Sequence, residues 1–180
     1  ADAAELWENI LSDYNEYYHG TFSYGYCLLK SGKYEVAIGQ FNKANDIMET
    51  SAAYYNKYLC YLSLGDSNRA MKEIEKAIEL DPIDSTYQLD AGEIYYQLGN
   101  YPQTISVLDK YLDQYPEDLY ARYLYCYSLY SIDQHELASK CFDLYLLLNP
   151  RDVDAMEAFA WSLKAVGKYK EALAQFQKCS

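Results

Sequence analysis

The chain has 180 residues, 51% of them hydrophobic, and its 15 basic and 27 acidic residues give a net charge of −12. This acidic balance argues against direct binding of nucleic acid, whose phosphates require a basic patch, and against attraction to anionic lipid surfaces. No apolar run approaches the roughly 18 residues that a membrane-spanning helix needs, so direct membrane insertion is not expected.

The five cysteines are odd in number and form no Cys-x-x-Cys motif. Most of them stand in apolar stretches, where a free cysteine behaves as a small hydrophobic residue. We therefore expect reduced structural thiols and a cytoplasmic location.

Residue types recur along the chain with a period of about 34. One column places a turn residue at the same point of every unit, a second places a small residue, a third a bulky apolar residue and a fourth a proline. The columns are Gly32, Gly65, Gly99, Asp133, Gly167; Ala37, Ala70, Thr104, Ala138, Ala172; Phe41, Ile74, Leu108, Phe142, Phe176; and Pro82, Pro116, Pro150. A period of this length indicates a stacked array whose units bury their apolar faces against their neighbours.

In chain order, residues 1–17 are predicted to form the second helix of an incomplete repeat, because their apolar residues continue the register backwards. Complete units follow at 18–50, 51–84, 85–118 and 119–152, and a last unit at 153–180 stops before its proline. In the third unit, Ser85 is a plausible N-cap, Gly99-Asn100 breaks the first helix, and Pro116 ends the second. Each unit is therefore predicted to be helix, tight turn, helix.

Packing within a unit is predicted from residue size. Gly92 and Thr104 would let two antiparallel helices approach closely, while Tyr95 and Leu108 fill the space beside them. In the second unit, Lys57 and Tyr58 occupy the two positions at which the repeat pattern has a leucine and a small residue. We expect Lys57 to reach out of the helix interface and Tyr58 to push the helices apart, with irregular curvature near residues 55–60.

These units resemble the tetratricopeptide repeat (TPR) family, whose pattern is W-x2-L-G-x2-Y, then A, then F, then P. Residues 119–152, for example, supply Tyr125-Cys126, Leu129, Ala138, Phe142 and Pro150. The resemblance covers essentially the whole chain. It implies an all-α fold, a right-handed superhelical solenoid of helix-turn-helix repeats forming a single array over 1–180, and a role in binding other proteins.

In the family, the first helices line a concave peptide-binding groove. The positions that this implies as peptide-binding here are Tyr26, Tyr55, Asn56, Asp90, Glu93, Tyr96, Tyr120, Tyr123, Tyr127, Tyr130, Glu157 and Trp161. The four tyrosines of the fourth repeat are spaced 3, 4 and 3 apart, which places them on one helical stripe. Beside the carboxylates, such a stripe suits a basic or apolar peptide segment. The alternative is that the stripe packs against neighbouring helices. One TPR subclass binds the C-terminal carboxylate of heat-shock chaperones through Lys, Asn and Arg side chains on these first helices. Only Asn56 matches that set in this sequence, so we expect no binding of chaperone C-termini.

No catalytic, metal or cofactor site is predicted. His19 and His135 stand in different repeats without local ligand partners, and the carboxylate pairs Asp90/Glu93 and Asp154/Glu157 are typical of a solvated acidic helix face. Phosphate-binding loops and nucleophile motifs are absent from the sequence.

The sequence therefore predicts a non-catalytic scaffold or adaptor that binds a peptide segment of a partner protein. One alternative is a small acidic TPR chaperone of a bacterial secretion system that holds apolar client segments. Another is a regulatory repeat region of a larger multidomain protein. Leu173 and Phe176 are expected to be exposed at the end of the last repeat. This favours the interpretation that the sequence is a fragment of a longer array, and the alternative is self-association through the open repeat ends.

Overall fold

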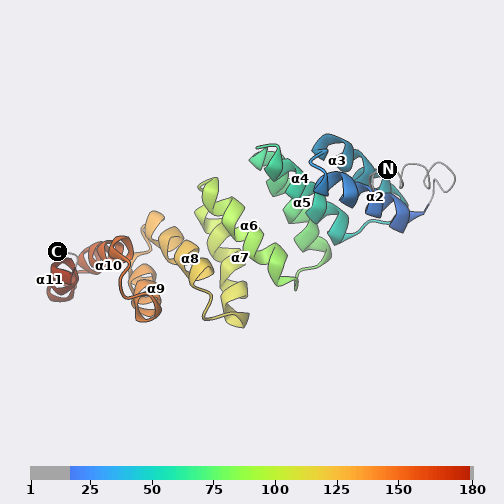
Figure 1. Cartoon of the computed structure of the whole chain (residues 1–180). Coiled ribbons are helices and arrows are strands. Elements are labelled where there is room, and N and C mark those ends of the chain that lie inside the picture. Colours follow the sequence, from blue (N-terminus) through green and yellow to red (C-terminus); the bar gives the residue numbers. More distant parts are fainter. Residues whose placement is uncertain (1–16, 179–180) are drawn as a thin grey trace. The chain divides into compact units, whose positions relative to one another are not determined.

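A computed structural model describes residues 17–178, in which every regular element is a helix (Figure 1). The expected helix at 1–17 lies outside the described residues, apart from its last position. No helix of the described segment is both long and apolar enough to cross a membrane. The helices are α2 (Tyr18–Lys30), α3 (Tyr34–Ile47), α4 (Ser51–Ser63), α5 (Ser67–Leu80), α6 (Ser85–Gln97), α7 (Tyr101–Gln114), α8 (Leu119–Ser131), α9 (His135–Leu148), α10 (Val153–Ala165) and α11 (Tyr169–Lys178).

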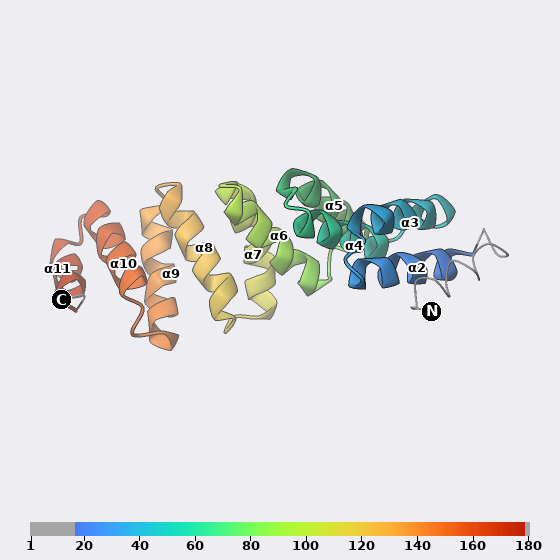
Figure 2. The same ribbon diagram turned by 45° about the horizontal axis from the view of Figure 1, so that its top comes forward.

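Consecutive helices form antiparallel pairs joined by a tight turn, as the sequence predicts (Figure 2). The turn residues adopt the left-handed conformation, with φ of 75° at Gly32 and 73° at Gly99, and also 59° at Asp133. In each case the next residue's N–H reaches back five residues, as Asn100 N does to Tyr95 O at 2.8 Å. These bonds satisfy carbonyls that the helix end would leave without partners. The recurring turn residue, Gly or Asp133, is therefore the left-handed residue that ends the first helix of each repeat.

The loops that contain the prolines lead into capped first helices. Asp118 Oδ1 accepts from Ala121 N at 2.9 Å, and its Oδ2 accepts from the Tyr111 hydroxyl at 2.8 Å. Asp152 repeats both bonds one repeat later, to Ala155 N and to the Tyr145 hydroxyl. Each aspartate thus ties the start of one repeat to the second helix of the previous one. In the third repeat the predicted Ser85 cap is wrong, since Asp84 accepts from the N–H groups of the first turn.

The chain divides into two compact units, 1–87 and 88–180. In unit 1, a core cluster joins α2, α3 and α4 through Leu28, Phe41 and Cys60. In unit 2, one cluster centres on Leu108 and Leu124 and another on Phe142 and Phe159. The small-residue column is buried in both units, with Ala37, Ala70, Thr104 and Ala138 at 0% exposure and Ala172 at 3%.

Two glycines in first helices permit the predicted close approach. A Cβ atom at Gly25 would lie 2.9 Å from Phe41 Cε1, and one at Gly92 would overlap the side chain of Leu108. Both partners are fully buried and cannot move into solvent. The prediction that Gly92 admits its paired helix is therefore confirmed, with Leu108 as the contacting side chain.

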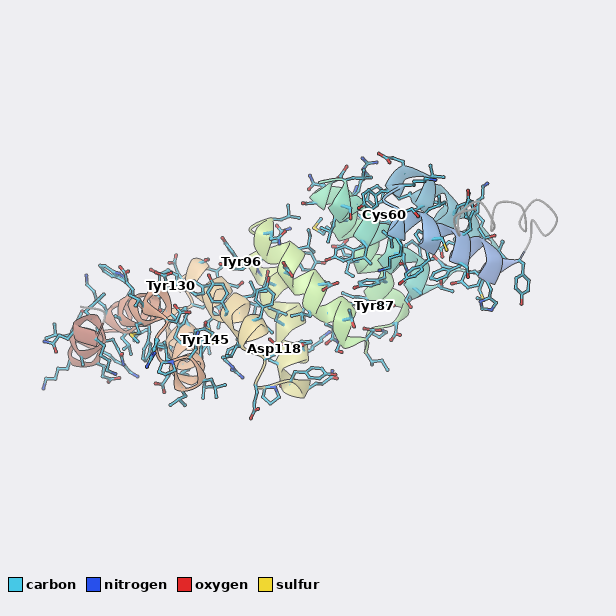
Figure 3. The ribbon with its side chains drawn as sticks, in the orientation of Figure 1. Cys60, Tyr87, Tyr96, Asp118, Tyr130 and Tyr145 are labelled. Carbon is cyan, nitrogen blue, oxygen red and sulfur yellow. A yellow bond between two sulfur atoms is a disulfide. The ribbon has the colours of Figure 1, made fainter. Side chains whose placement is uncertain are left out.

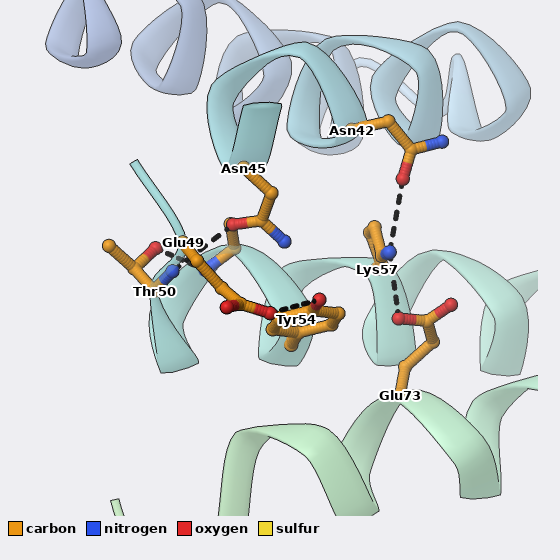
Figure 4. A network of polar contacts seen from close by, with 8 residues as sticks. Asn42, Asn45, Glu49, Thr50, Tyr54, Lys57 and Glu73 are labelled. Atoms are coloured by element: carbon orange, nitrogen blue, oxygen red, sulfur yellow. Dashed lines mark hydrogen bonds and ion pairs between the residues drawn. The ribbon is translucent and has the colours of Figure 1, made fainter. Parts of the chain in front are cut away.

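The expectation for Lys57 is wrong. Its side chain is buried rather than reaching outward, and Nζ lies 2.8 Å from Glu73 Oε2 on α5 and 3.0 Å from Asn42 Oδ1 on α3 (Figure 4). It also lies 4.6 Å from the ring centre of Tyr54. Burial removes water from the ammonium group of Lys57, which costs free energy. The carboxylate and the amide oxygen offset that cost by interacting with the ammonium group directly. Tyr58 is likewise buried. The predicted irregular curvature stays a prediction.

The expectation of reduced cysteines is also wrong for one pair. Cys126 of α8 and Cys141 of α9 form a disulfide within the fourth repeat, whereas Cys27 and Cys60 are free. Burial raises the pKa of the Cys60 thiol to about 11. Because the helices of one repeat pack side by side, cysteines 15 residues apart in sequence come within bonding distance. The cysteines therefore no longer support a cytoplasmic location.

We predict that Gly92→Ala destabilises the protein by about 1–3 kcal/mol, because the added methyl group overpacks against Leu108. The matched control is Gly39→Ala in α3, where a Cβ meets nothing within 4 Å. That change should stabilise by about 0.5–1 kcal/mol through helix propensity alone. Urea unfolding of both variants measures the difference. Equal effects at the two positions would contradict the close approach at Gly92.

A second prediction concerns the buried ion pair. Lys57→Met should cost about 2–4 kcal/mol, since it leaves the Glu73 carboxylate, only 18% exposed, without its cation. The double variant Lys57→Met/Glu73→Val should recover most of that loss, because both charges are then absent. The free energies of unfolding of the two single variants and the double variant form the test. An additive double variant would show that the two charges do not interact.

Candidate functional site on the first helices

The predicted binding positions of unit 2 lie on three successive first helices, α6, α8 and α10. We call this surface the first-helix face. α8 contacts α10 directly, and the rings of Tyr96 on α6 and Tyr123 on α8 lie 6.5 Å apart. Figure 3 shows Tyr96 on α6 and Tyr130 on α8. The face consists of Asp90, Glu93, Tyr96, Tyr120, Tyr123, Tyr127, Tyr130, Asp154, Glu157 and Trp161.

The two middle tyrosines of the stripe pack against other helices. The Tyr123 ring lies 4.5 Å from that of Tyr127 and 6.2 Å from that of Tyr145 on α9. Tyr127 meets Phe142 edge to face at 5.1 Å. Both tyrosines flank the hydrophobic core. These contacts favour the packing alternative for Tyr123 and Tyr127, both of which are half-buried.

The first tyrosine of the stripe is more open. Tyr120 is 47% exposed, and its hydroxyl lies near the Glu93 carboxylate of the preceding repeat. Partial burial and this carboxylate raise the pKa of Tyr120 to about 12. Burial and the neighbouring Tyr123 also raise the pKa of Tyr96 to about 12. An exposed ring beside a carboxylate presents apolar surface and negative charge together.

The same combination recurs on α10. Trp161 is 42% exposed, and its Nε1 donates to Glu157 Oε1 at 3.3 Å. Its ring meets Phe176 of α11 edge to face at 5.3 Å, and Lys164 Nζ lies 4.3 Å from its centre. The tryptophan is thus held in place from two sides while part of its surface stays open.

A surface depression of about 540 Å³ lies beside Trp161, at the turn ends of the last two repeats. The turn and the second helices contribute Asp133, His135 and Tyr169 to its lining. His135 Nε2 lies 3.4 Å from Asp133 Oδ1, and its ring lies 5.6 Å from that of Tyr130. Sequence reasoning missed these three residues because it took candidates only from first helices. The lining residues are Tyr130, Ser131, Asp133, His135, Trp161, Lys164, Ala165 and Tyr169.

The three predicted positions in unit 1 differ in exposure. Tyr26 is 43% exposed, with Lys30 Nζ 5.2 Å from its ring centre. Tyr55 is half-buried and packs on Tyr87 at 4.8 Å. Asn56 is buried, and its Nδ2 donates to Ala52 O at 2.7 Å, so its amide is occupied within its own helix. Of these three, Tyr26 offers the most open surface.

We predict that the tyrosines titrate late and that alkaline pH destabilises the fold. Burial raises the pKa of Tyr127, and the pKa values of Tyr96, Tyr111, Tyr120 and Tyr125 reach about 12, against about 10 in an unfolded chain. Between these values the folded chain binds more protons than the unfolded chain. The stabilisation is therefore complete below about pH 10 and is lost as pH rises towards 12. Ultraviolet titration of tyrosinate, with urea unfolding at about pH 9 and about pH 11, measures both effects. A native titration centred near 10 would contradict the prediction.

Two antiparallel helices per 34 residues, small residues at their crossing and a left-handed turn between them define a helical-repeat solenoid protein. Comparison with known families agrees, since the tetratricopeptide repeat model matches residues 1–51 and 60–119. The chain belongs to the tetratricopeptide repeat family.

Relatives and solved structures share this architecture. The chain is 26% identical over 167 residues to TPR repeat-containing protein MJ1428 of Methanocaldococcus jannaschii, a match that covers 89% of this chain and 29% of that protein. It is 33% identical over 93 residues to Hsp70-Hsp90 organizing protein 1 of Glycine max, covering 51% of this chain and 15% of that protein. The chain therefore spans less than a third of the length of these curated relatives.

Among solved structures, YrrB, described as a TPR protein with an unusual peptide-binding site, superimposes with a TM-score of 0.82 at 18% identity, covering 98% of this chain and 92% of YrrB. A MamA structure gives 0.75 at 21% identity, covering 90% and 89%. At these identities the likeness establishes the fold, a helical-repeat solenoid typical of protein-interaction scaffolds.

Proposed function

We propose that this chain is a non-catalytic interaction module whose first-helix face binds a peptide segment with basic and apolar residues. The observation that carries the proposal is the repeated pairing of an aromatic ring with a carboxylate on this face. Tyr120 pairs with Glu93, and Trp161 pairs with Glu157. Asp154 lies close enough to Tyr127 to contribute to its raised pKa.

The pair of Tyr120 and Glu93 suits a basic ligand side chain. An aromatic ring attracts a cation over its face, and the adjacent carboxylate adds direct charge complementarity. The rings also give rigid contact area to apolar or proline residues at small entropic cost. The net charge of −12 would attract a basic segment over a longer range. The exposed ammonium of Lys164 beside Trp161 favours apolar rather than basic ligand residues at that end.

The comparisons support the proposal in two ways. Tetratricopeptide repeats typically bind other proteins rather than catalyse reactions, and YrrB carries a peptide-binding site according to its description.

Binding of synthetic peptides tests the proposal. A fluorescently labelled peptide of alternating Lys, Leu and Pro is compared with one in which Glu replaces every Lys. Tyr120→Ala and Trp161→Ala should each weaken binding of the basic peptide by about tenfold, as expected for aromatic residues that dominate an interface. Glu93→Gln/Glu157→Gln should weaken it mainly at low salt, because screening removes the charge term.

The matched control is Tyr115→Ala, since Tyr115 is 44% exposed but lies at the end of a second helix. It should leave affinity unchanged. Equal binding of both peptides, or equal losses for Tyr120→Ala and Tyr115→Ala, would overturn the proposal. Salt-independent capture of apolar unfolded segments would instead favour the secretion-chaperone alternative.

A further inference from the structure

The surface depression beside Trp161 is lined by aromatic rings from both of the last two repeats. Tyr130 of α8 is half-buried, whereas Trp161 and Tyr169 are 42% and 69% exposed. We call this depression of about 540 Å³ the turn depression. Its volume lies within the range of about 300–1,000 Å³ that is typical of ligand pockets. Because it is open to solvent, it suits one large side chain of a peptide better than a small molecule that must be enclosed.

The charge around the turn depression differs from that of the whole chain, which is −12. Residues 161–170 carry Lys164, Lys168 and Lys170 and no acidic residue. The equivalent residues of the fourth repeat, 127–136, carry two acidic residues and no lysine or arginine. All three lysines are exposed, and in the part of the chain that the structure describes none of them forms an ion pair. An acidic chain therefore presents a local cluster of cations at this place.

Two carboxylates lie close to the same depression, but each already faces a donor of its own. Asp133 Oδ1 lies 3.4 Å from His135 Nε2, and Glu157 Oε1 accepts from Trp161 Nε1 at 3.3 Å. Lys164 Nζ instead lies 4.3 Å from the centre of the Trp161 ring, and a ring is a weaker partner for an ammonium group than a carboxylate. The charge that still lacks a counter-ion at the turn depression is therefore positive.

We propose that the turn depression binds a peptide segment in which an aromatic or proline residue is flanked by acidic residues. The ring of that residue would pack against Trp161 and Tyr169, which supply rigid contact area. The flanking carboxylates would reach the ammonium groups of Lys164 and Lys168, giving charge complementarity that fixes where the segment binds.

The surroundings favour a short acidic segment over an extended polyanion. Nucleic acid or an anionic membrane would extend far beyond three lysines and meet the repulsion of a chain whose net charge is −12. A peptide whose acidic residues are confined to a few positions meets the lysines without that repulsion.

This proposal goes beyond the basic segment proposed for the first-helix face and does not depend on it. The two surfaces share Tyr130 and Trp161, whereas Lys164, Lys168 and Tyr169 belong to the turn depression alone. Substitutions at these last three residues therefore test the turn depression without altering the first-helix face.

Fluorescence anisotropy with the whole chain provides the test. The probe is a labelled peptide that alternates Asp with Tyr and Pro, and the comparison peptides carry Lys in place of Asp or Ala in place of Tyr and Pro. The acidic aromatic peptide should bind most tightly. Tyr169→Ala should weaken its binding by about tenfold, and Lys164→Gln/Lys168→Gln by about three- to tenfold at low salt. Asp133→Asn should strengthen binding by about twofold, because it removes an opposing charge and Asn tolerates the left-handed turn.

The matched control is Lys30→Gln/Lys33→Gln, which removes two exposed lysines at the turn of the first repeat. It should leave affinity unchanged, and a loss equal to that of the other lysine variant would overturn the proposal in favour of general charge attraction. Equal binding of the three peptides, or an unchanged affinity in Tyr169→Ala, would also overturn it. So would tighter binding of a labelled oligothymidylate. None of these outcomes bears on the basic peptide, whose loss of affinity in Tyr120→Ala tests the first-helix face separately.

Discussion

Every repeat depends on the close crossing of its two helices. At that crossing the second helix places a small residue, Ala37, Ala70, Thr104, Ala138 or Ala172, and each is at most 3% exposed. Close-packed interiors tolerate little change in volume, so this column sets the distance between the helices. Around the crossing the repeats use different chemistry. Glycines face Phe41 and Leu108 in the first and third repeats, an ion pair joins the helices of the second, and a disulfide joins those of the fourth.

The same crossing decides which side chains remain for binding. The side of each first helix that faces its partner is fully used in packing, and the flanks are partly covered by neighbouring repeats. Tyr123 and Tyr127 lie on such flanks, whereas Tyr120 and Trp161 lie farther out and keep an adjacent carboxylate. Second helices have one unshared side, where three repeats carry an exposed lysine and an exposed acidic residue at the positions that α9 fills with Leu144 and Leu147. A repeat array thus offers two independent surfaces whose chemistry can change without altering the core.

The sequence alone predicts the structural features that recur in every repeat, and it does not reveal the features that occur in one repeat only. The period locates each described helix and turn, even where Asp133 replaces a glycine, because four columns report the same register. The buried Lys57 was missed because its partners lie on two other helices, and a lysine by itself gives no signal of burial. The disulfide was missed for the same reason. The link from Tyr111 to Asp118 could have been found, since Tyr145 and Asp152 repeat it 34 residues later. Helical spacing placed all four tyrosines of the stripe on one face, but it could not show which of them the adjacent helices cover.

The disulfide of the fourth repeat has a mechanical consequence. Cys126 and Cys141 enclose the end of α8, the turn and the start of α9 in a covalent loop. When the chain is pulled from its ends, tension passes through the sulfur atoms and bypasses this loop. The cysteines are separated by 15 positions in the sequence, and at about 3.5 Å for each extended residue the fully stretched chain is shorter by about 50 Å. The turn at Asp133 therefore carries no load, and the fourth repeat cannot be drawn out as completely as its neighbours.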